Sequence, residues 1–281
     1  MKFIQEAVNA IHLDGVYIFK NIVGDDVLKS IAHDVETNRI SMAQNKVGGV
    51  YLKNGQYFHS QLLSVSRAFV EFALSEYVHD ICKAYFGMSI YRMKCHRYYE
   101  NYGWYKGQAW HIDNKNGEDQ ILACNRGLIF IVYFDETDDG AFEYLQGSHG
   151  TSSNLQGSWA VDRWLDADYI QTRKRRALGN SGDMIVYDTS LIHRAGSIEK
   201  HDTLRRALFM QVDTDMNNGE PMYVMPGNLP RSLPHLSEEA ILNFVGFGLP
   251  CLPRPWPSSD YAQYLEFEEK LKLLRSTPVN R

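Results

Sequence analysis

The chain lacks the features that would assign it to several large classes of protein. It has four cysteines in 281 residues, and no two of them form a C-x-x-C pair, so zinc-ribbon and thioredoxin motifs are excluded. No stretch approaches the roughly 18 consecutive apolar residues of a membrane span. Lysine and arginine (29) are outnumbered by aspartate and glutamate (34), which argues against a nucleic-acid-binding surface. We therefore expect neither a membrane nor a nucleic acid as a partner.

The N-terminus and the cysteines predict a cytoplasmic location. Residues 1–8 have no long apolar run and include Glu6, which is unlike a signal peptide. The cysteines are expected to be reduced thiols, although a disulfide pair is compatible with the sequence. They are widely spaced, at Cys82, Cys95, Cys124 and Cys251.

The hydrophobic content of 44% suffices for one large core, and the sequence contains no repeat and no low-complexity linker. We predict a single domain over residues 1–281. Residues 1–88 have mainly helical spacing of apolar residues and are expected to support the core. Residues 89–215 carry strand signals, with a polar insertion at 152–180. Residues 216–281 are a proline-rich C-terminal extension that ends in a predicted amphipathic helix at 261–274.

The pattern predicts particular elements within these parts. Helices are expected over 3–12, from 25 onward, over 61–86 and near 160–173. Strands are expected at 16–19, 90–99, 108–113, 127–134, 141–145, 184–187 and 204–213. The run at 127–134 is continuously apolar, which is typical of a strand buried on both faces. Short strands between turns indicate a β-sandwich or a barrel.

The segment 108–113, with the sequence QAWHID, carries the first candidate site. In a strand, His111 and Asp113 would project from one face. Together they supply two of the three ligands of a 2-His-1-carboxylate iron site, and His193 is a candidate for the third. His-x-Asp alone is common, so the alternatives are a surface pair for the first two residues and a structural histidine for the third.

Arg205 and Arg206 lie in the predicted strand that follows His193. An arginine in a partly buried strand needs an anionic partner, and its planar guanidinium matches a carboxylate. Two histidines, a carboxylate and a downstream arginine are therefore what a site for iron and a dicarboxylate co-substrate would need. A plain salt bridge is the alternative for either arginine.

Several segments, in this order, resemble the phytanoyl-CoA dioxygenase (PhyH)-like family of Fe(II)/2-oxoglutarate-dependent oxygenases. They are 14–19, 108–113, 140–149, 182–187, 192–196 and 205–208. The resemblance covers roughly residues 10–212. It implies a mainly β fold with flanking helices, namely a double-stranded β-helix (jelly roll, cupin-like). It also implies Fe(II), 2-oxoglutarate and O2 as cofactors.

By position, the resemblance makes His111, Asp113 and His193 the iron ligands and Arg205 the anchor of 2-oxoglutarate. Arg206 is disfavoured as the anchor because one step along a strand reverses the face. Some relatives carry a serine or threonine two residues after the distal histidine, where this chain has Ala195.

Two groups of residues complete the predicted pocket. Gln108 or Tyr98 could supply to the co-substrate the polar group that Ala195 lacks. Tyr99, Trp110 and Trp164 are predicted to line the substrate pocket, where aromatic rings pack on a flat molecule. A buried core strand is the alternative for the aromatic run near Tyr99, and a lid is the expectation for the insertion that contains Trp164.

The predicted function is oxidation of a small molecule, most simply hydroxylation, with oxidative decarboxylation of 2-oxoglutarate to succinate and CO2. Desaturation and cyclisation share this chemistry, whereas Asp113 disfavours halogenation. The alternatives are an iron-dependent oxidase that does not consume 2-oxoglutarate and a non-catalytic β-helix binding protein. The basic run at 173–176 is either a solvated helix face or a contact for a phosphate-bearing, carrier-linked substrate. A homodimer through the C-terminal extension is also expected.

Overall fold

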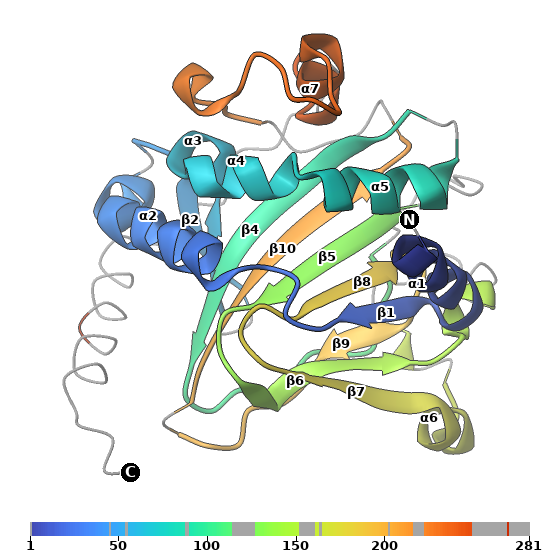
Figure 1. Cartoon of the computed structure of the whole chain (residues 1–281). Helices are drawn as coiled ribbons and strands as arrows, with labels where there is room; N and C mark the ends of the chain where they lie inside the picture. The colour runs from blue at the N-terminus through green and yellow to red at the C-terminus, as the bar shows by residue number, and fades with distance from the viewer. Residues whose placement is uncertain are drawn as a thin grey trace.

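The structure is a computed structural model that describes residues 2–44, 46–53, 56–87, 90–113, 127–151, 161–162, 165–201, 203–215, 222–248 and 269. Two antiparallel sheets form its centre (Figure 1). The larger sheet has seven strands in the spatial order β1 (Val16–Phe19), β8 (Met184–Asp188), β5 (Gly127–Tyr133), β10 (Leu204–Asp213), β4 (Arg92–Tyr102), β3 (Gln56–Ser60) and β2 (Gly49–Lys53). The smaller sheet has the order β7 (Lys174–Gly179), β6 (Thr137–Leu145) and β9 (His193–Ala195). The predicted jelly-roll class, mainly β with flanking helices, is confirmed.

Helices lie on the side of the large sheet that faces away from the small sheet (Figure 1). They are α1 (Lys2–Asp14), α2 (Asp25–Ala43), α3 (Leu62–Val65), α4 (Arg67–Ala73), α5 (Glu76–Phe86) and α7 (Glu238–Phe244). α6 (Ala167–Arg173) leads into β7, and single 3-10 turns occur at Ser148–Gly150 and Pro226–Asn228. No helix in the described part of the chain is both long enough and apolar enough to cross a membrane.

The predicted helix over 61–86 is divided into three helices. Ser66 ends α3 and caps α4, because its hydroxyl accepts a hydrogen bond from the backbone N–H of Phe69 at 3.1 Å. α5 ends at Gly87, whose φ of +68° is a conformation that other residues rarely adopt. The apolar periodicity runs through all three helices because they bury the same face against the large sheet.

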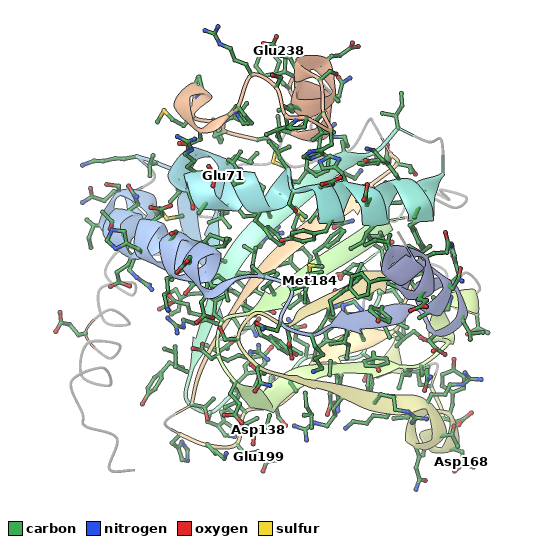
Figure 2. The ribbon with its side chains drawn as sticks, in the orientation of Figure 1. Glu71, Asp138, Asp168, Met184, Glu199 and Glu238 are labelled. Carbon is green, nitrogen blue, oxygen red and sulfur yellow. The ribbon has the colours of Figure 1, made fainter. Side chains whose placement is uncertain are left out.

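Side chains of the large sheet alternate between two cores (Figure 2). On β5, Leu128 and Phe130 point to the helices, whereas Ile129 and Ile131 point to the small sheet. This arrangement explains why the sequence of β5 is apolar throughout, as expected for a strand buried on both faces. The same alternation on β4 and β10 determines which side chains enter the space between the sheets.

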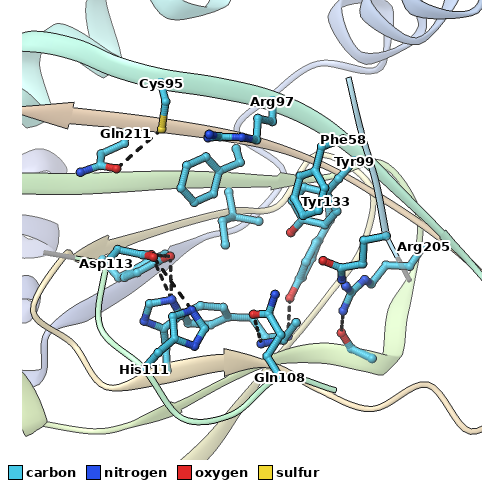
Figure 3. Close-up of a pocket in the computed structure, with 18 residues that line it drawn as sticks. Phe58, Cys95, Arg97, Tyr99, Gln108, His111, Asp113, Tyr133, Arg205 and Gln211 are labelled. Carbon is cyan, nitrogen blue, oxygen red and sulfur yellow. Dashed lines mark hydrogen bonds and ion pairs between the residues drawn. The ribbon is translucent and has the colours of Figure 1, made fainter. Parts of the chain in front are cut away.

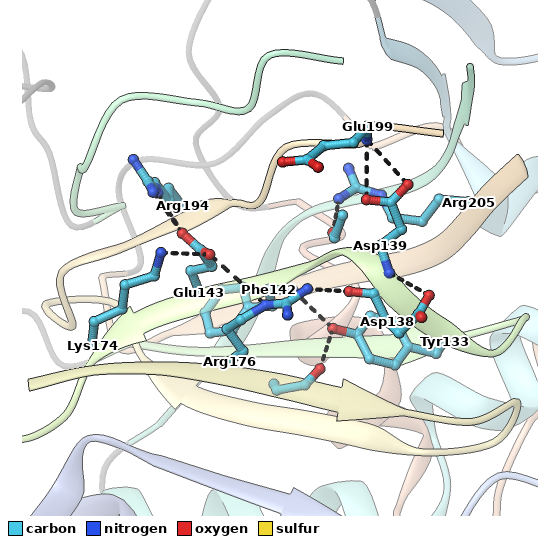
Figure 4. Close-up of polar contacts among 12 residues, drawn as sticks. Tyr133, Asp138, Asp139, Phe142, Glu143, Lys174, Arg176, Arg194, Glu199 and Arg205 are labelled. Carbon is cyan, nitrogen blue, oxygen red and sulfur yellow. Dashed lines mark hydrogen bonds and ion pairs between the residues drawn. The ribbon is translucent and has the colours of Figure 1, made fainter. Parts of the chain in front are cut away.

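Some predicted elements differ from the structure. The strand predicted at 141–145 is longer in the structure, since β6 begins at Thr137. Of the basic run at 173–176, Arg173 ends α6 and the other three residues begin β7, so the run is not a helix face. Lys174 Nζ and Arg176 Nε lie 2.8 and 3.9 Å from Glu143 Oε1 (Figure 4). A basic run has no apolar period, so its sequence favours neither a helix nor a strand. The predicted final helix lies outside the described residues, apart from Glu269.

A buried ion pair joins the helices to the sheet. Glu100 on β4 is 0% exposed, and its carboxylate is 2.5 Å from Arg39 Nη1 and 3.0 Å from His59 Nε2. Burial by itself would raise the pKa of Glu100, but the charge of Arg39 and the hydrogen bonds from Arg39 and His59 outweigh it and hold the pKa well below its usual range. The carboxylate is therefore ionised in the folded protein.

We expect Glu100→Gln to lower the free energy of unfolding by about 3–5 kcal/mol, because it removes the buried carboxylate that pairs with both Arg39 and His59. Since the pKa of Glu100 is depressed on folding, its stabilisation is complete above the pKa of the unfolded carboxyl and is lost as the pH falls toward the folded value. Denaturant unfolding of both proteins at neutral and acidic pH would measure this effect.

The matched control is Glu71→Gln on the outer surface of α4 (Figure 2). Glu71 forms an exposed ion pair with Arg67 at 3.0 Å. Exposed pairs of this kind contribute at most about 1 kcal/mol, so the control should unfold almost as the wild type does. Equal effects of the two substitutions would show that the ion pair of Glu100 has no special weight in stability.

Candidate metal centre

Three predicted ligands come together at the small sheet. One ligand atom from each of His111, Asp113 and His193 lies within 4.8 Å of the others. His193 begins β9, and His111 faces it through reciprocal backbone hydrogen bonds of 3.0 and 2.9 Å. The strand predicted at 108–113 is reduced to this single bridge. The expected juxtaposition of the side chains nevertheless holds, because Asp113 is fixed separately by a bond from its N–H to Thr189 O at 3.0 Å.

Both imidazoles are held in the same way. Nδ1 of His111 lies 2.8 Å from the carbonyl oxygen of Ala109, and Nδ1 of His193 lies 2.8 Å from that of Leu191. A carbonyl oxygen only accepts, so each Nδ1 carries a proton, and each neutral ring can then present its Nε2 lone pair to a metal. This is the arrangement by which proteins orient metal-binding histidines. The donor set of two Nε2 atoms and one carboxylate therefore fits a divalent transition metal.

Tyr187 on β8 contacts the same centre, and the sequence analysis did not identify it. Its hydroxyl lies 3.0 Å from Asp113 Oδ2 and 3.2 Å from His193 Nε2. One feature of the chain could have pointed to Tyr187, namely its position near the end of the strand that precedes His193. In the structure Tyr187 pairs with Ile129 of β5, whose side chain faces the space between the two sheets. Tyr187 donates a hydrogen bond to one carboxylate oxygen and so restricts how Asp113 can turn.

The electrostatics of the centre keep its carboxylate charged. Burial would raise the pKa of Asp113, but the neighbouring His193 and His111 and a hydrogen bond from Tyr187 hold that pKa well below its usual range. Burial, together with the Asp113 charge, raises the pKa of Tyr187 well above the ordinary value for a phenol. The centre therefore offers an anionic oxygen ligand beside a neutral hydroxyl donor.

A cavity of about 260 Å³ opens beside the three ligands, between the two sheets (Figure 3). Its walls are formed by side chains of β3, β4, β5 and β10 on one side and of β6 and β9 on the other. Arg205 lines the same cavity as the three ligands. The structure thus brings together the four residues that the sequence analysis proposed for iron and its co-substrate.

Arg205 is a buried cation whose described hydrogen bonds go only to neutral groups. It is 4% exposed, and its Nη2 donates to Asn101 Oδ1 at 2.9 Å. Its Nη1 donates to the carbonyl of Gly140, and Nε has no hydrogen-bond partner among the described residues. The guanidinium also lies over the ring of Tyr99, 5.7 Å from its centroid. Because a buried charge without a counter-ion is costly, this end of the cavity is suited to an anionic ligand.

Groups near Arg205 strengthen the preference of this end of the cavity for an anionic ligand. Burial raises the pKa of Tyr105 to about 12, and it also raises that of Tyr99, so both phenols beside Arg205 stay neutral. Gln56 on β3 lines the cavity, is 2% exposed, and has an Nε2 donor for which the described residues supply no acceptor. Buried donors without acceptors are uncommon, and each one is satisfied if a ligand supplies an oxygen. The Arg205 end therefore fits a carboxylate of 2-oxoglutarate.

Arg206 faces the opposite side of the sheet. Its Nε and Nη2 contact the two carboxylate oxygens of Asp135 at 2.9 and 2.5 Å. A guanidinium paired in this bidentate way is fully engaged. The structure thus places Arg205, and not Arg206, in the cavity that the three candidate metal ligands line.

Other predicted pocket residues need correction. Gln108 and Tyr99 line the cavity as expected. Tyr98 does not, because it points toward the helices and packs against Phe134 with ring centroids 5.0 Å apart. Trp110 is buried in a separate apolar cluster and lies beneath the guanidinium of Arg194, 4.4 Å from the ring centroid. The predicted role of Trp164 falls outside the described residues.

Comparison with known proteins gives one family and several related folds. A family model described as phytanoyl-CoA dioxygenase (PhyH) matches residues 11–207. A comparison with curated protein sequences gives no match. Six solved structures that resemble this chain are between 10% and 16% identical to it, so they show the fold alone.

Three of these structures illustrate the likeness. EctD from S. alaskensis has a TM-score of 0.60 at 16% identity, covering 83% of this chain and 85% of that chain, and a second structure of it holds Fe. HygX from Streptomyces hygroscopicus, with nickel and 2-oxoglutarate bound, has a TM-score of 0.55 at 13% identity, covering 77% and 89%. SnoK, a non-heme alpha-ketoglutarate-dependent carbocyclase from nogalamycin biosynthesis, has a TM-score of 0.59 at 13% identity, covering 75% and 84%.

Proposed function

The chain belongs to the phytanoyl-CoA dioxygenase family, and from this premise we propose that it hydroxylates a small molecule in the cavity between its two sheets. It is an Fe(II)/2-oxoglutarate-dependent dioxygenase, with iron, 2-oxoglutarate and O2 as its cofactors. The observation that carries the proposal is the buried Arg205, which shares one cavity with the three metal-binding side chains. A metal site alone would need no such cation.

The proposed roles follow from the geometry. His111, Asp113 and His193 hold the iron, and Tyr187 keeps the Asp113 carboxylate in place. Arg205 binds the carboxylate of 2-oxoglutarate that lies farther from the metal. When bound, iron and 2-oxoglutarate supply the oxidising chemistry, in which O2 converts 2-oxoglutarate to succinate and CO2 and a substrate carbon is oxidised.

The protein contributes binding, orientation and exclusion of water. Each histidine presents Nε2 to the metal because its Nδ1 is committed to a backbone carbonyl. Phe142 and Ile131 add apolar surface to the cavity walls near the metal ligands. An apolar wall that excludes water strengthens the electrostatic contacts inside the pocket and limits side reactions.

The alternative of an oxidase that does not consume 2-oxoglutarate gives no role to the buried Arg205 or to the Gln56 amide, whose Nε2 has no acceptor in the described part of the chain. In support of 2-oxoglutarate, HygX is similar in fold and holds nickel with 2-oxoglutarate. A homodimer, a carrier-linked substrate and a cytoplasmic location stay predictions.

Anaerobic titration with Fe(II) and 2-oxoglutarate tests the proposed function. We expect a weak visible absorption band when both are present, since the keto acid chelates the iron, and no band when succinate replaces 2-oxoglutarate. Admitting O2 together with an accepted substrate should then release succinate. Iron binding without the band would favour an oxidase that does not use 2-oxoglutarate, and absence of iron binding would contradict the proposal altogether.

A further inference from the structure

The β8–β9 loop, at residues 188–192, supports two of the three candidate metal ligands. The carbonyl oxygen of Thr189 accepts the backbone N–H of Asp113 at 3.0 Å. The carbonyl oxygen of Leu191 lies 2.8 Å from Nδ1 of His193. Because both oxygens belong to one short loop, the placement of Asp113 and of the His193 ring depends on how that loop is held.

Asp188 at the end of β8 sets the turn of this loop. Its backbone carbonyl accepts the N–H of Leu191 at 2.8 Å, and its carboxylate oxygen Oδ1 accepts the N–H of Ser190 at 2.7 Å. An aspartate that bonds to the backbone two residues further along the chain stabilises a turn, because its side chain takes the place of a backbone acceptor. The position of the Asp188 carboxylate therefore helps to decide where the carbonyl groups of the loop point.

Tyr85 on α5 holds the same carboxylate from the helix side of the large sheet. Its hydroxyl donates to Asp188 Oδ2, and Tyr85 is 4% exposed. Its ring stacks on that of His12 on α1, with centroids 4.9 Å apart, and Figure 1 shows these two helices close together beside β1 and β8. A hydrogen bond to a charged oxygen is stronger than one between neutral groups. The two oxygens of Asp188 are thus divided, with one bonded to the loop and the other to the helix layer.

Other bonds also reach the loop, but they connect it only to neighbouring parts of the β structure. The N–H of Thr189 donates to Gly127 O on β5 at 3.0 Å, and the N–H of Ile192 donates to Ser148 Oγ at 2.9 Å. Among the described contacts of the loop, the one between Tyr85 and Asp188 carries a charge and crosses to the helices. It is therefore the contact whose loss should loosen the turn most.

Neither Tyr85 nor Asp188 lines the cavity as described. Asp188 pairs with Leu128 of β5, whose side chain points to the helices, whereas the preceding Tyr187 points to the space between the sheets. Successive residues of a strand face opposite sides, which explains why Asp188 is turned away from the metal centre. Any influence of the pair on the metal ligands therefore passes through the loop.

We propose that Tyr85 and Asp188 are positioning residues of the metal centre, which hold the β8–β9 loop so that Asp113 and His193 are in place before the metal binds. This inference rests on the proposed function, since the metal is the iron of that site. Groups that orient metal ligands through hydrogen bonds contribute to metal affinity, because a ligand that must first be ordered binds more weakly. The metal centre is thereby coupled to the packing of α1 and α5.

Anaerobic titration of the full chain with Fe(II) alone tests the inference. Tyr85→Phe removes the hydroxyl and keeps the ring, and it should raise the Fe(II) dissociation constant by about three- to tenfold, less than the loss of a group that contacts a ligand directly. Asp188→Ala removes both side-chain contacts and should raise this constant by about 10- to 100-fold. Asp188→Asn keeps an oxygen for the N–H of Ser190, so its affinity should lie between those of the wild type and Asp188→Ala.

The matched control is Tyr91→Phe. The Tyr91 hydroxyl lies 3.0 Å from Nδ1 of His79, and Tyr91 packs on the same helix-side core without a described contact to the loop. This substitution should lower the melting temperature of the metal-free protein about as much as Tyr85→Phe does, because each removes one phenol hydrogen bond. Its Fe(II) affinity should stay within about twofold of the wild type, since Tyr91 orients no ligand. A purely structural role of Tyr85 would change the melting temperature alone.

The inference is wrong if Tyr85→Phe or Asp188→Ala binds Fe(II) within about twofold of the wild type, or if Tyr91→Phe weakens binding as much as Tyr85→Phe does. Should Asp188→Ala fail to fold, as judged by its thermal melt, Asp188→Asn takes its place, and an unchanged Fe(II) affinity in that variant would contradict the inference. Tight Fe(II) binding by the wild type together with unchanged variants refutes this inference alone. Absence of Fe(II) binding by the wild type refutes the proposed function.

Discussion

Asp113→Ala is expected to weaken Fe(II) binding by at least about 100-fold and to abolish succinate release. Asp113 is the one anionic member of the described triad, and its carboxylate contacts His193 Nε2 at 3.1 Å. Substitution of residues that only support metal ligands already costs about 10- to 100-fold in metal affinity, so loss of a ligand itself should cost more. Anaerobic Fe(II) titration and measurement of succinate would record both effects.

The control for this experiment is Asp168→Ala, in the exposed first turn of α6 (Figure 2). This substitution also removes one aspartate carboxylate, but at the surface of the fold and away from the three candidate metal ligands. We expect its Fe(II) affinity and turnover to match those of the wild type. If Asp113→Ala bound Fe(II) within about threefold of the wild type, the assignment of the carboxylate ligand would be incorrect.

Arg205→Ala should raise the dissociation constant of 2-oxoglutarate by at least about 100-fold while leaving Fe(II) binding intact. A hydrogen bond to a charged group contributes roughly 1.5–3 kcal/mol, and two such bonds from one guanidinium correspond to about two decades or more in affinity. The alanine would also leave the buried carboxylate of 2-oxoglutarate unpaired. Titration of 2-oxoglutarate at fixed Fe(II), followed by the visible band, measures the change.

The adjacent arginine supplies a stringent comparison. Arg206→Ala removes the bidentate contact with Asp135 on the helix side of the sheet and should lower thermal stability. It should leave the affinity for 2-oxoglutarate within about twofold, because Arg206 does not line the cavity. The opposite result, with Arg206→Ala losing 2-oxoglutarate and Arg205→Ala retaining it, would move the anchor to the other side of the sheet.

Polar groups from several segments surround the metal centre. Two residues after His193, where some relatives carry serine or threonine, the chain has Ala195. The hydroxyl of Tyr187, on β8, reaches both Asp113 and His193. Gln108 also approaches this position, and its Oε1 accepts from the Ala195 N–H at 3.4 Å. The polar environment of the iron site is therefore assembled from several segments.

The sequence by itself predicted the class of fold and the segments that carry the three candidate metal ligands. The apolar run of β5 and the periodic helices α1 and α2 have strong local patterns, because each buries a face that its own spacing defines. The order of His-x-Asp, distal histidine and arginine is likewise a property of the chain. These features needed no knowledge of what packs against them.

Only the tertiary structure decided which side chains face the cavity. The alternation of a strand shows that Tyr98 and Tyr99 point to opposite faces of the sheet, as do Arg205 and Arg206. Which member of each pair faces the cavity depends on the side of the sheet that the helices cover. The same limit hid the position of Tyr187, whose hydroxyl contacts Asp113 from a distant segment of the chain. Trp110 was misplaced for this reason as well, because contacts of residues far apart in sequence set its direction. A local pattern fixes the alternation of a strand, whereas the packing of the whole chain fixes its inside and outside.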